Sequence, residues 1–152
     1  ISGQRRWNTW QGWRKEFSAM SELKIHQFAD KHLGKSFQWG MMDCNTFILE
    51  YMDLMLGTNL LKEAQGKYSS KRSAVRFQMK YPLLLRDAMY EHGAADIPNK
   101  AVNVGDILIK DLGIFQAAHL VLGSRVMSVD EEKGVISIPL PDLDFDYALR
   151  VR

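Results

Sequence analysis

The sequence predicts an α+β fold, with N-terminal helices packed on an antiparallel sheet of roughly five strands. Before residue 100, apolar residues recur at helical spacing, and several of these segments end at a glycine. After residue 100, short runs rich in Val, Ile and Leu are separated by Gly, Asp and Lys, which is typical of strands and turns. Because the helices precede the strands, we expect an antiparallel sheet packed on the helices.

Four segments predict the helices. The first is SELKIHQFADKHLG, residues 21–34, in which the apolar residues lie mostly on one side and Gly34 ends the helix. The second is CNTFILEYMDLML, which follows Asp43 and stops at Gly57. A shorter helix is expected within GKYSSKRSAVRFQMKY after its polar start. A last helix is expected in PLLLRDAMYEHG, which begins with proline and ends with glycine.

The expected strands follow in one block. Five runs carry strand chemistry bounded by turn residues: GDILIK, AHLVLG, RVMSV, GVISIPL and YALRVR. We expect these runs to form the sheet of a single domain over residues 21–152, since 152 residues suffice for one domain with a core.

Composition excludes several classes of protein. The net charge of +2 is too small to indicate nucleic-acid binding by itself, and no apolar run reaches the roughly 18 residues of a membrane span. The single cysteine excludes a disulfide framework and a multi-cysteine zinc site. The start of the sequence is basic without an apolar core, so we expect no signal peptide. We expect no metal and no organic cofactor.

Residues 1–20 form a basic, tryptophan-rich extension that differs from the rest of the chain. Its aromatic and basic residues are Trp7, Trp10, Trp13, Arg5, Arg6, Arg14 and Lys15. Such an extension either docks on its own domain or a partner, or acts as an arm for a membrane surface or nucleic acid. Because tryptophan and arginine dominate protein contacts, we expect it to dock onto another protein.

The only cysteine, Cys44, follows an expected helix N-cap at Asp43. In the first turn of a helix, the dipole and the unpaired N–H groups favour a thiolate and lower the pKa of the thiol. A thiolate is a nucleophile for acyl transfer, and the same N–H groups stabilise an oxyanion. Gly40 lets the chain approach closely before Cys44. The alternative is that Cys44 is a small buried apolar residue.

A thiolate enzyme needs a general base, and four histidines compete for that role. His26 and His32 are six residues apart on the first helix, do not share a face, and are expected to be solvated or half-buried. His92 stands at a helix C-terminus, where a cation is favourable. His119 is the only histidine expected on the sheet, so it is the candidate base, although a histidine beside apolar residues is usually a core residue.

FQWGMMDCNTF, followed by GDILIK and AHLVLG, resembles the NlpC-like family of papain-fold peptidases over roughly residues 25–150. That family cuts amide bonds in the stem peptides of peptidoglycan. The resemblance implies a papain-like, NlpC-type fold with Cys44 as the nucleophile and His119 as the base. MDLMLGTNLL and GKYSS resemble a phage and prophage branch of the family.

The resemblance also implies a substrate-binding stretch before the nucleophile. Trp39 belongs to the family's aromatic-x-Trp-Gly motif, and Asp43 to its Asp-Cys pair. Gln38 lies six residues before Cys44, where papain-type enzymes place an oxyanion-hole glutamine; the alternative is a surface amide. Phe37 stands where the family usually has a tyrosine, and DCNT departs from its usual Asp-Cys-Ser-Gly.

The third catalytic residue departs from the family as well. On the strand that follows His119, Ser128 is the nearest positional match and Asp130 comes two residues later. A carboxylate such as that of Asp130 holds an imidazolium in other triads, and a loop charge is its commoner role. PDLDFDY, with three alternating aspartates, echoes a calcium loop but lacks its glycine and distal glutamate. We expect a solvated acidic loop there.

Two functions from different classes remain. The first is a cysteine amidase or endopeptidase that acts on peptidoglycan peptides, within a phage tail or virion or in the host cell envelope after delivery. The second is a structural tail or virion component with a papain-like fold and weak or no activity. In both, tail or virion proteins are the expected partners of residues 1–20, and no nucleic-acid partner is expected.

Overall fold

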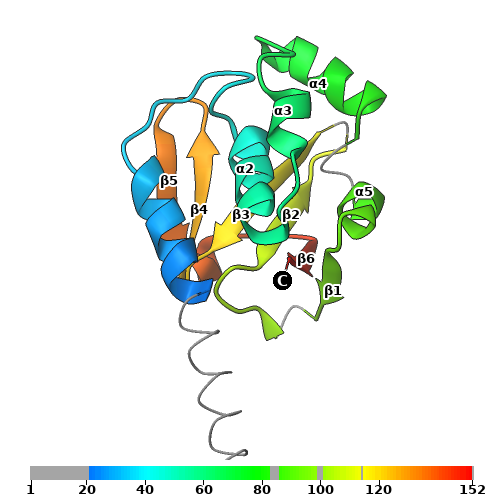
Figure 1. Cartoon of the computed structure of the whole chain (residues 1–152). Helices are drawn as coiled ribbons and strands as arrows, with labels where there is room; N and C mark the ends of the chain where they lie inside the picture. Colours follow the sequence, from blue (N-terminus) through cyan, green and yellow to red (C-terminus); the bar gives the residue numbers. More distant parts are fainter. Residues whose placement is uncertain (1–20, 83–85, 99–100, 114, 152) are drawn as a thin grey trace, which may run out of the picture.

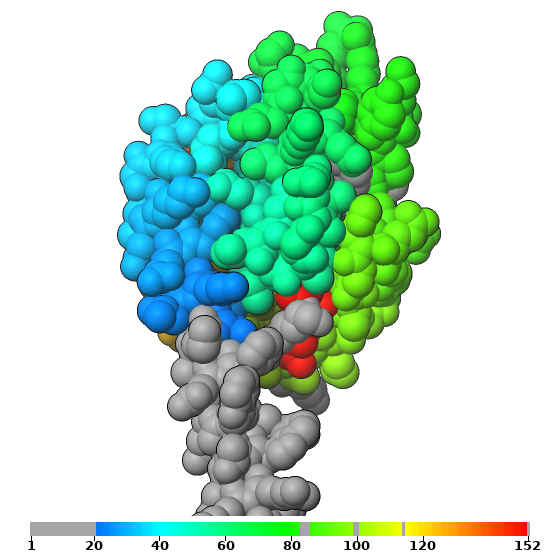
Figure 2. All heavy atoms as spheres, viewed as in Figure 1, coloured from blue at the N-terminus to red at the C-terminus, as the bar shows by residue number. Residues whose placement is uncertain are grey.

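A computed structural model describes residues 21–82, 86–98, 101–113 and 115–151 (Figure 1). The expected extension over residues 1–20 lies outside the described residues. The fold is α+β, as the sequence predicts, and its sheet is antiparallel. The sheet has six strands in the order β1-β6-β2-β3-β4-β5, one more than expected. In the space-filling view, the helical segments cover most of this face of the sheet (Figure 2).

The second expected helix is α2, Cys44–Leu56, and its bounds are as predicted. It begins after Asp43 because the carboxylate accepts hydrogen bonds from the backbone N–H groups of Asn45 and Thr46. The Asp43 backbone N–H in turn donates to the Thr46 side-chain oxygen, which completes a capping box. The helix ends at Gly57, which adopts the left-handed conformation.

The first helix covers residues 21–32 and lies beside α2. Ile25, Phe28 and Ala29 are buried as expected, whereas Leu23 and Leu33 are each 57% exposed. His32 occupies the buried stripe instead, because positions 25, 28, 29 and 32 lie on one side of a helix. The expectation that His32 is solvated or half-buried is therefore wrong.

Short helices connect α2 to the sheet. They are α3 (Leu60–Ala64), α4 (Lys71–Lys80) and α5 (Arg86–Glu91). The sequence analysis missed α3, which has only five residues and no side-chain cap. In the described part of the chain, no helix has the length and apolarity that crossing a bilayer requires.

The five expected runs all form strands. They are β2 (Ile107–Asp111), β3 (Gln116–Val121), β4 (Arg125–Asp130), β5 (Gly134–Pro139) and β6 (Tyr147–Arg150). A 3-10 helix, Leu140–Asp142, follows β5. The additional strand is β1, Ala95–Ile97, which pairs with β6 at the sheet edge. Three residues that include an aspartate carry too little strand signal to be recognised in a sequence.

The two faces of the sheet carry separate apolar clusters. The first cluster packs with α2 and the helix at 21–32, and its sheet residues include Ile107, Ile109, Ala118, Leu120 and Met127. The second cluster lies on the other face and contains Ile97, Leu108, Val121, Val126 and Ala148. Alternate residues of a strand point to opposite faces, so these clusters define the face of every side chain on β2 and β3.

Candidate active site

Asp43 anchors the segment that carries the cysteine. Its Oδ1 caps α2, while its Oδ2 accepts hydrogen bonds from the Gly40 N–H at 2.9 Å and from the Tyr68 hydroxyl at 2.7 Å. The side chain is 1% exposed, so this buried carboxylate is satisfied by four donors. The sequence analysis did not identify Tyr68. Its position in GKYSS was the only available signal.

Gly40 brings this segment against the backbone that carries Tyr68. Its φ of +79° lies in the left-handed region, and a Cβ at this position would collide with the Tyr68 carbonyl oxygen. The Gly40 carbonyl also accepts a hydrogen bond from the Gly66 N–H. The expectation that Gly40 permits a close backbone approach is therefore confirmed, and the approach is to residues 66–68.

Cys44 heads α2, as predicted, but its thiol is buried. The residue is 8% exposed, and its Sγ donates to the Oδ1 of Asn45 at 3.6 Å. Burial, followed by the negative charge of Asp43, raises the pKa of the Cys44 thiol to about 12. Hydrogen bonds from nearby backbone groups act in the opposite direction but are outweighed. The prediction of a partly exposed thiol with a lowered pKa is wrong.

The sulfur of Cys44 lies where β3 and β4 separate. The ladder between these strands pairs Leu120 with Met127 and Val121 with Val126, and it stops there. At the next positions the Ser128 hydroxyl donates to the Ala118 carbonyl at 3.0 Å, and the backbone of Ala118 hydrogen-bonds the Cys44 sulfur. The start of α2 therefore contacts the backbone of β3 directly.

His119 points away from this contact. It pairs with Leu108 across β2 and β3, and Leu108 belongs to the cluster on the face opposite α2. Side chains of directly opposed residues share a face, so the imidazole lies on that face too. Burial, followed by the positive charge of Lys110, lowers the pKa of His119. Its Nδ1 is buried and has no hydrogen-bond partner among the described residues.

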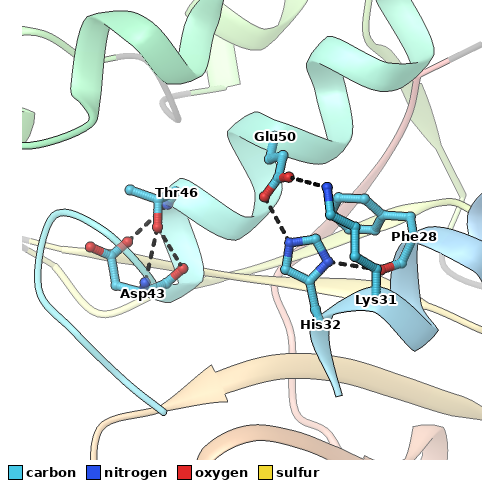
Figure 3. A network of polar contacts seen from close by, with 6 residues as sticks. All are labelled: Phe28, Lys31, His32, Asp43, Thr46 and Glu50. Carbon is cyan, nitrogen blue, oxygen red and sulfur yellow. Dashed lines mark hydrogen bonds and ion pairs between the residues drawn. The ribbon is translucent and has the colours of Figure 1, made fainter. Parts of the chain in front are cut away.

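His32 connects the first helix to α2 through polar contacts. Its Nε2 lies 2.7 Å from Oε2 of Glu50, and its Nδ1 lies 2.8 Å from the Phe28 carbonyl oxygen (Figure 3). The hydrogen bond from His32 is the main cause that lowers the pKa of Glu50, and Lys31 contributes to it. This network joins the helix at 21–32 to α2, so His32 has a structural role.

Neither of the remaining histidines is a hydrogen-bond partner of the thiol. His26 is an exposed residue of the first helix. His92 follows α5, next to Gly93, which lies close to Leu56 at the opposite end of α2 from Cys44. The thirteen residues of α2 separate these ends by about 18 Å.

The two candidates for the third catalytic residue are engaged elsewhere. Ser128 is buried and donates to the Ala118 carbonyl. Asp130 accepts hydrogen bonds from the N–H groups of Glu132 and Lys133, so its carboxylate closes the turn between β4 and β5. Neither residue bonds His119. Asp130 therefore has the loop role given above as its commoner one, and local turn and backbone groups satisfy both side chains.

The expected substrate-binding stretch lies at the surface before α2. Gln38 is exposed, and its backbone forms an isolated bridge with Met42. Trp39 is half-buried between two aromatic rings, with centroid distances of 4.7 Å to Phe37 and 6.4 Å to Phe115. The Trp39 ring therefore packs residues 37–39 against the turn between β2 and β3.

A small cavity lies near the start of α2, but Cys44 is not among the residues that line it. A cavity of about 10 Å³ lies beside Asn45 and is also lined by Tyr68 and Gln78. This volume is at the lower limit for a single water molecule and cannot admit a peptide. Within the described ranges, no three His, Cys, Asp or Glu side chains gather where they could hold a metal ion.

An α+β domain with a helix-capping Asp-Cys pair against the middle of its sheet matches one family model. The model is described as Domain of unknown function (DUF6950), and it matches residues 11–151. The chain therefore belongs to the DUF6950 family. Among curated proteins, none matches this sequence.

Proposed function

We propose that this chain is a non-catalytic domain with a papain-like fold that serves as a structural component of a phage tail or virion. One observation is the main support for the absence of catalysis in this proposal. The pairing of Leu108 with His119 directs the imidazole to the face of the sheet opposite Cys44. A nucleophile and its base must lie within hydrogen-bond reach of each other, and a sheet between them excludes this.

Two further observations support the proposal. All four histidines lie in the described part of the chain, and none of the other three is placed to accept a proton from Cys44. The thiol is protonated at neutral pH, since its pKa is raised to about 12. The papain-like architecture and the tail or virion context rest on the resemblance of FQWGMMDCNTF and GDILIK to the NlpC-like family.

The decisive experiment compares the wild type with Cys44→Ala on intact peptidoglycan from several wall types. Mass spectrometry of the soluble fraction measures released peptides. We expect the wild type and Cys44→Ala to release the same background amount of peptide. We expect His119→Ala to release that amount as well. Peptide release that requires both Cys44 and His119 would overturn the proposal.

A cysteine amidase is the second candidate, and one observation favours it. Backbone groups of Ala118, Cys44 and Asn45 hydrogen-bond the sulfur and favour its thiolate. Such donors also stabilise an oxyanion. This candidate requires β3 to slip by one residue, which would move His119 to the face of α2. The same release assay decides between the two candidates.

The structural role requires partners. We propose that tail or virion proteins bind residues 1–20, where three tryptophans stand among four basic residues. Deleting residues 1–20 should prevent incorporation into the parent assembly and leave the thermal unfolding of the domain nearly unchanged. A truncated chain that is incorporated normally would contradict this contact.

A further inference from the structure

The surface of α3 and α4 carries a concentrated excess of positive charge. Residues 59–81 contain six basic side chains and one acidic side chain, Glu63, a balance of +5 against +2 for the whole chain. The basic residues are Lys62, Lys67, Lys71, Arg72, Arg76 and Lys80, and all six are exposed. None of them forms an ion pair with another described residue.

Three of these side chains form a stripe along α4. Arg72, Arg76 and Lys80 follow one another at intervals of four residues, so they lie on one side of the helix. Like charges at this spacing destabilise a helix, and so do cations in its first turn, which here contains Lys71 and Arg72. An anionic partner bound along the stripe would offset both effects.

An aromatic groove borders the stripe. It has a volume of about 740 Å³ and lies between α3 and α4, with Phe77 and Tyr81 beside Lys62 and Lys67. Phe77 and Tyr81 each follow a residue of the stripe and therefore lie about 100° further around α4. The exposed side chain of Met79, at 76%, adds apolar surface. The face thus combines cations with apolar contact area.

The chain itself contains a segment with the complementary pattern. Asp142, Asp144 and Asp146 are exposed and alternate with Leu143 and Phe145, which pack against the second apolar cluster. Alternate residues of an extended chain lie about 6.6–6.8 Å apart. Leu143 has an extended backbone, so Asp142 and Asp144 are separated by about this distance. Four residues of a helix rise about 6 Å, so these two aspartates match two successive cations of the stripe.

These aspartates remain accessible. The side chain of Asp144 is 94% exposed although it pairs with Lys110 at 3.4 Å. Asp146 uses one carboxylate oxygen to accept from the Asp111 N–H. In Figure 1, α4 lies at one end of the molecule, and the segment between β5 and β6 lies toward the other end. The two surfaces cannot meet within one molecule.

We propose that the Arg72–Arg76–Lys80 stripe binds the Asp142–Asp146 segment of a second copy of the chain, head to tail. Because the two surfaces differ, the contact is heterologous, and repeating it produces a ring or a filament. This inference does not depend on whether Cys44 is catalytic. It is tested by molecular mass, whereas the proposed function is tested by peptide release.

A charge-reversal experiment on the full chain tests the contact. One variant carries Arg72→Glu, Arg76→Glu and Lys80→Glu; the other carries Asp142→Lys and Asp144→Lys and leaves Asp146 in its hydrogen bond. Light scattering after size exclusion measures mass at about 0.05 M and about 0.5 M salt. We expect the wild type to associate at low salt, and each variant alone to associate at least about tenfold more weakly.

The mixture of the two variants provides the specific control. The variant with the reversed aspartates keeps the native stripe, and the variant with the reversed stripe keeps the native acidic segment, so these two surfaces can bind each other. The two reversed surfaces also have opposite charges and can bind each other. Mixing should therefore restore association, whereas circular dichroism confirms that each variant is folded. A wild type that stays monomeric at low salt, or variants that associate like it, would overturn the proposal. A monomeric wild type whose stripe binds single-stranded oligonucleotide would assign this face to nucleic acid instead.

Discussion

Cys44 and His119 lie on opposite faces of the six-stranded sheet, although the Cys44 sulfur contacts β3 only one residue before His119. The sulfur of Cys44 meets the backbone of Ala118, one residue before His119. The side chain of Ala118 belongs to the cluster that packs under α2, and His119 alternates to the other face. A separation of one residue along a strand therefore keeps the thiol and the imidazole apart.

Disulfide formation tests this arrangement. With Cys44 as the native partner, His119→Cys should form no disulfide under mild oxidation, because the two Cβ atoms point to different sides of the sheet. Ala118→Cys, whose side chain faces α2, is the matched variant and should crosslink more readily. Mass spectrometry of the oxidised, non-reduced proteins measures the outcome. Efficient crosslinking of His119→Cys alone would mean that β3 has the other register.

The buried thiol should resist alkylation. Since the pKa of Cys44 is raised to about 12, the rate of reaction with iodoacetamide should stay low through neutral pH and rise only in alkaline solution. The same protein in urea supplies the control, because its exposed thiol should titrate near the free value of roughly 8.5. A native midpoint below that value would show that the thiol is activated.

Gly40 should tolerate substitution poorly. Gly40→Ala places a Cβ against the Tyr68 carbonyl oxygen at a φ of +79°, and we expect a loss of about 3 kcal/mol or more in the free energy of unfolding. Gly34→Ala is the matched control, because Gly34 has the same φ and no atom within 4 Å of its added Cβ. Its cost should be only the backbone strain, about 1–2 kcal/mol. Urea unfolding measures both values, and equal losses would contradict the close approach.

Tyr68 should contribute stability through its hydroxyl. Tyr68→Phe removes the hydrogen bond to the Asp43 carboxylate, and we expect a loss of about 1.5–3 kcal/mol in the free energy of unfolding. Tyr81→Phe, at an exposed position, should change this free energy little. Burial, followed by the charge of Asp43, also raises the pKa of the Tyr68 phenol. The difference in ultraviolet absorbance between the wild type and Tyr68→Phe should therefore show this phenol ionising at a more alkaline pH in the native protein than in the unfolded protein. If Tyr68→Phe lowers the free energy of unfolding no more than Tyr81→Phe does, the Tyr68 hydroxyl does not stabilise the fold.

The contact of Glu50 with His32 should make the free energy of unfolding depend on pH in the acidic range. The pKa of Glu50 is lowered on folding, so its contribution is fully present above the unfolded value of about 4.5 and is lost as the pH falls through the folded value. Glu50→Gln should cost about 1–3 kcal/mol at neutral pH. It should cost less in acid, where the wild type has lost the same contribution.

The control for this pair is Glu63→Gln, which changes an exposed glutamate on α3. The change in the free energy of unfolding between about pH 7 and about pH 3 should be the same for Glu63→Gln as for the wild type. A loss for Glu50→Gln that is the same at both values would show that the carboxylate charge contributes nothing.

The sequence by itself determined the features that depend on local chemistry. Asp43 and Gly57 bound α2 because a capping carboxylate and a left-handed glycine act within one turn of the helix. The five later runs of Val, Ile and Leu became strands for a similar reason, since turn residues separate them in the chain. The order of helices and strands then led directly to the α+β class.

Only the tertiary structure decided which side chains meet. The face of His119 follows from its register against β2, and a slip of one residue would reverse it. That register is set by the turn in which the Leu112 N–H bonds the Phe115 carbonyl, a contact that apolar spacing does not encode. The burial of Cys44 and the partnership of His32 with Glu50 depend likewise on segments packed from elsewhere in the chain. Burial and register are properties of the packed sheet, so they set the pKa of the thiol and the position of the imidazole after the local elements have formed.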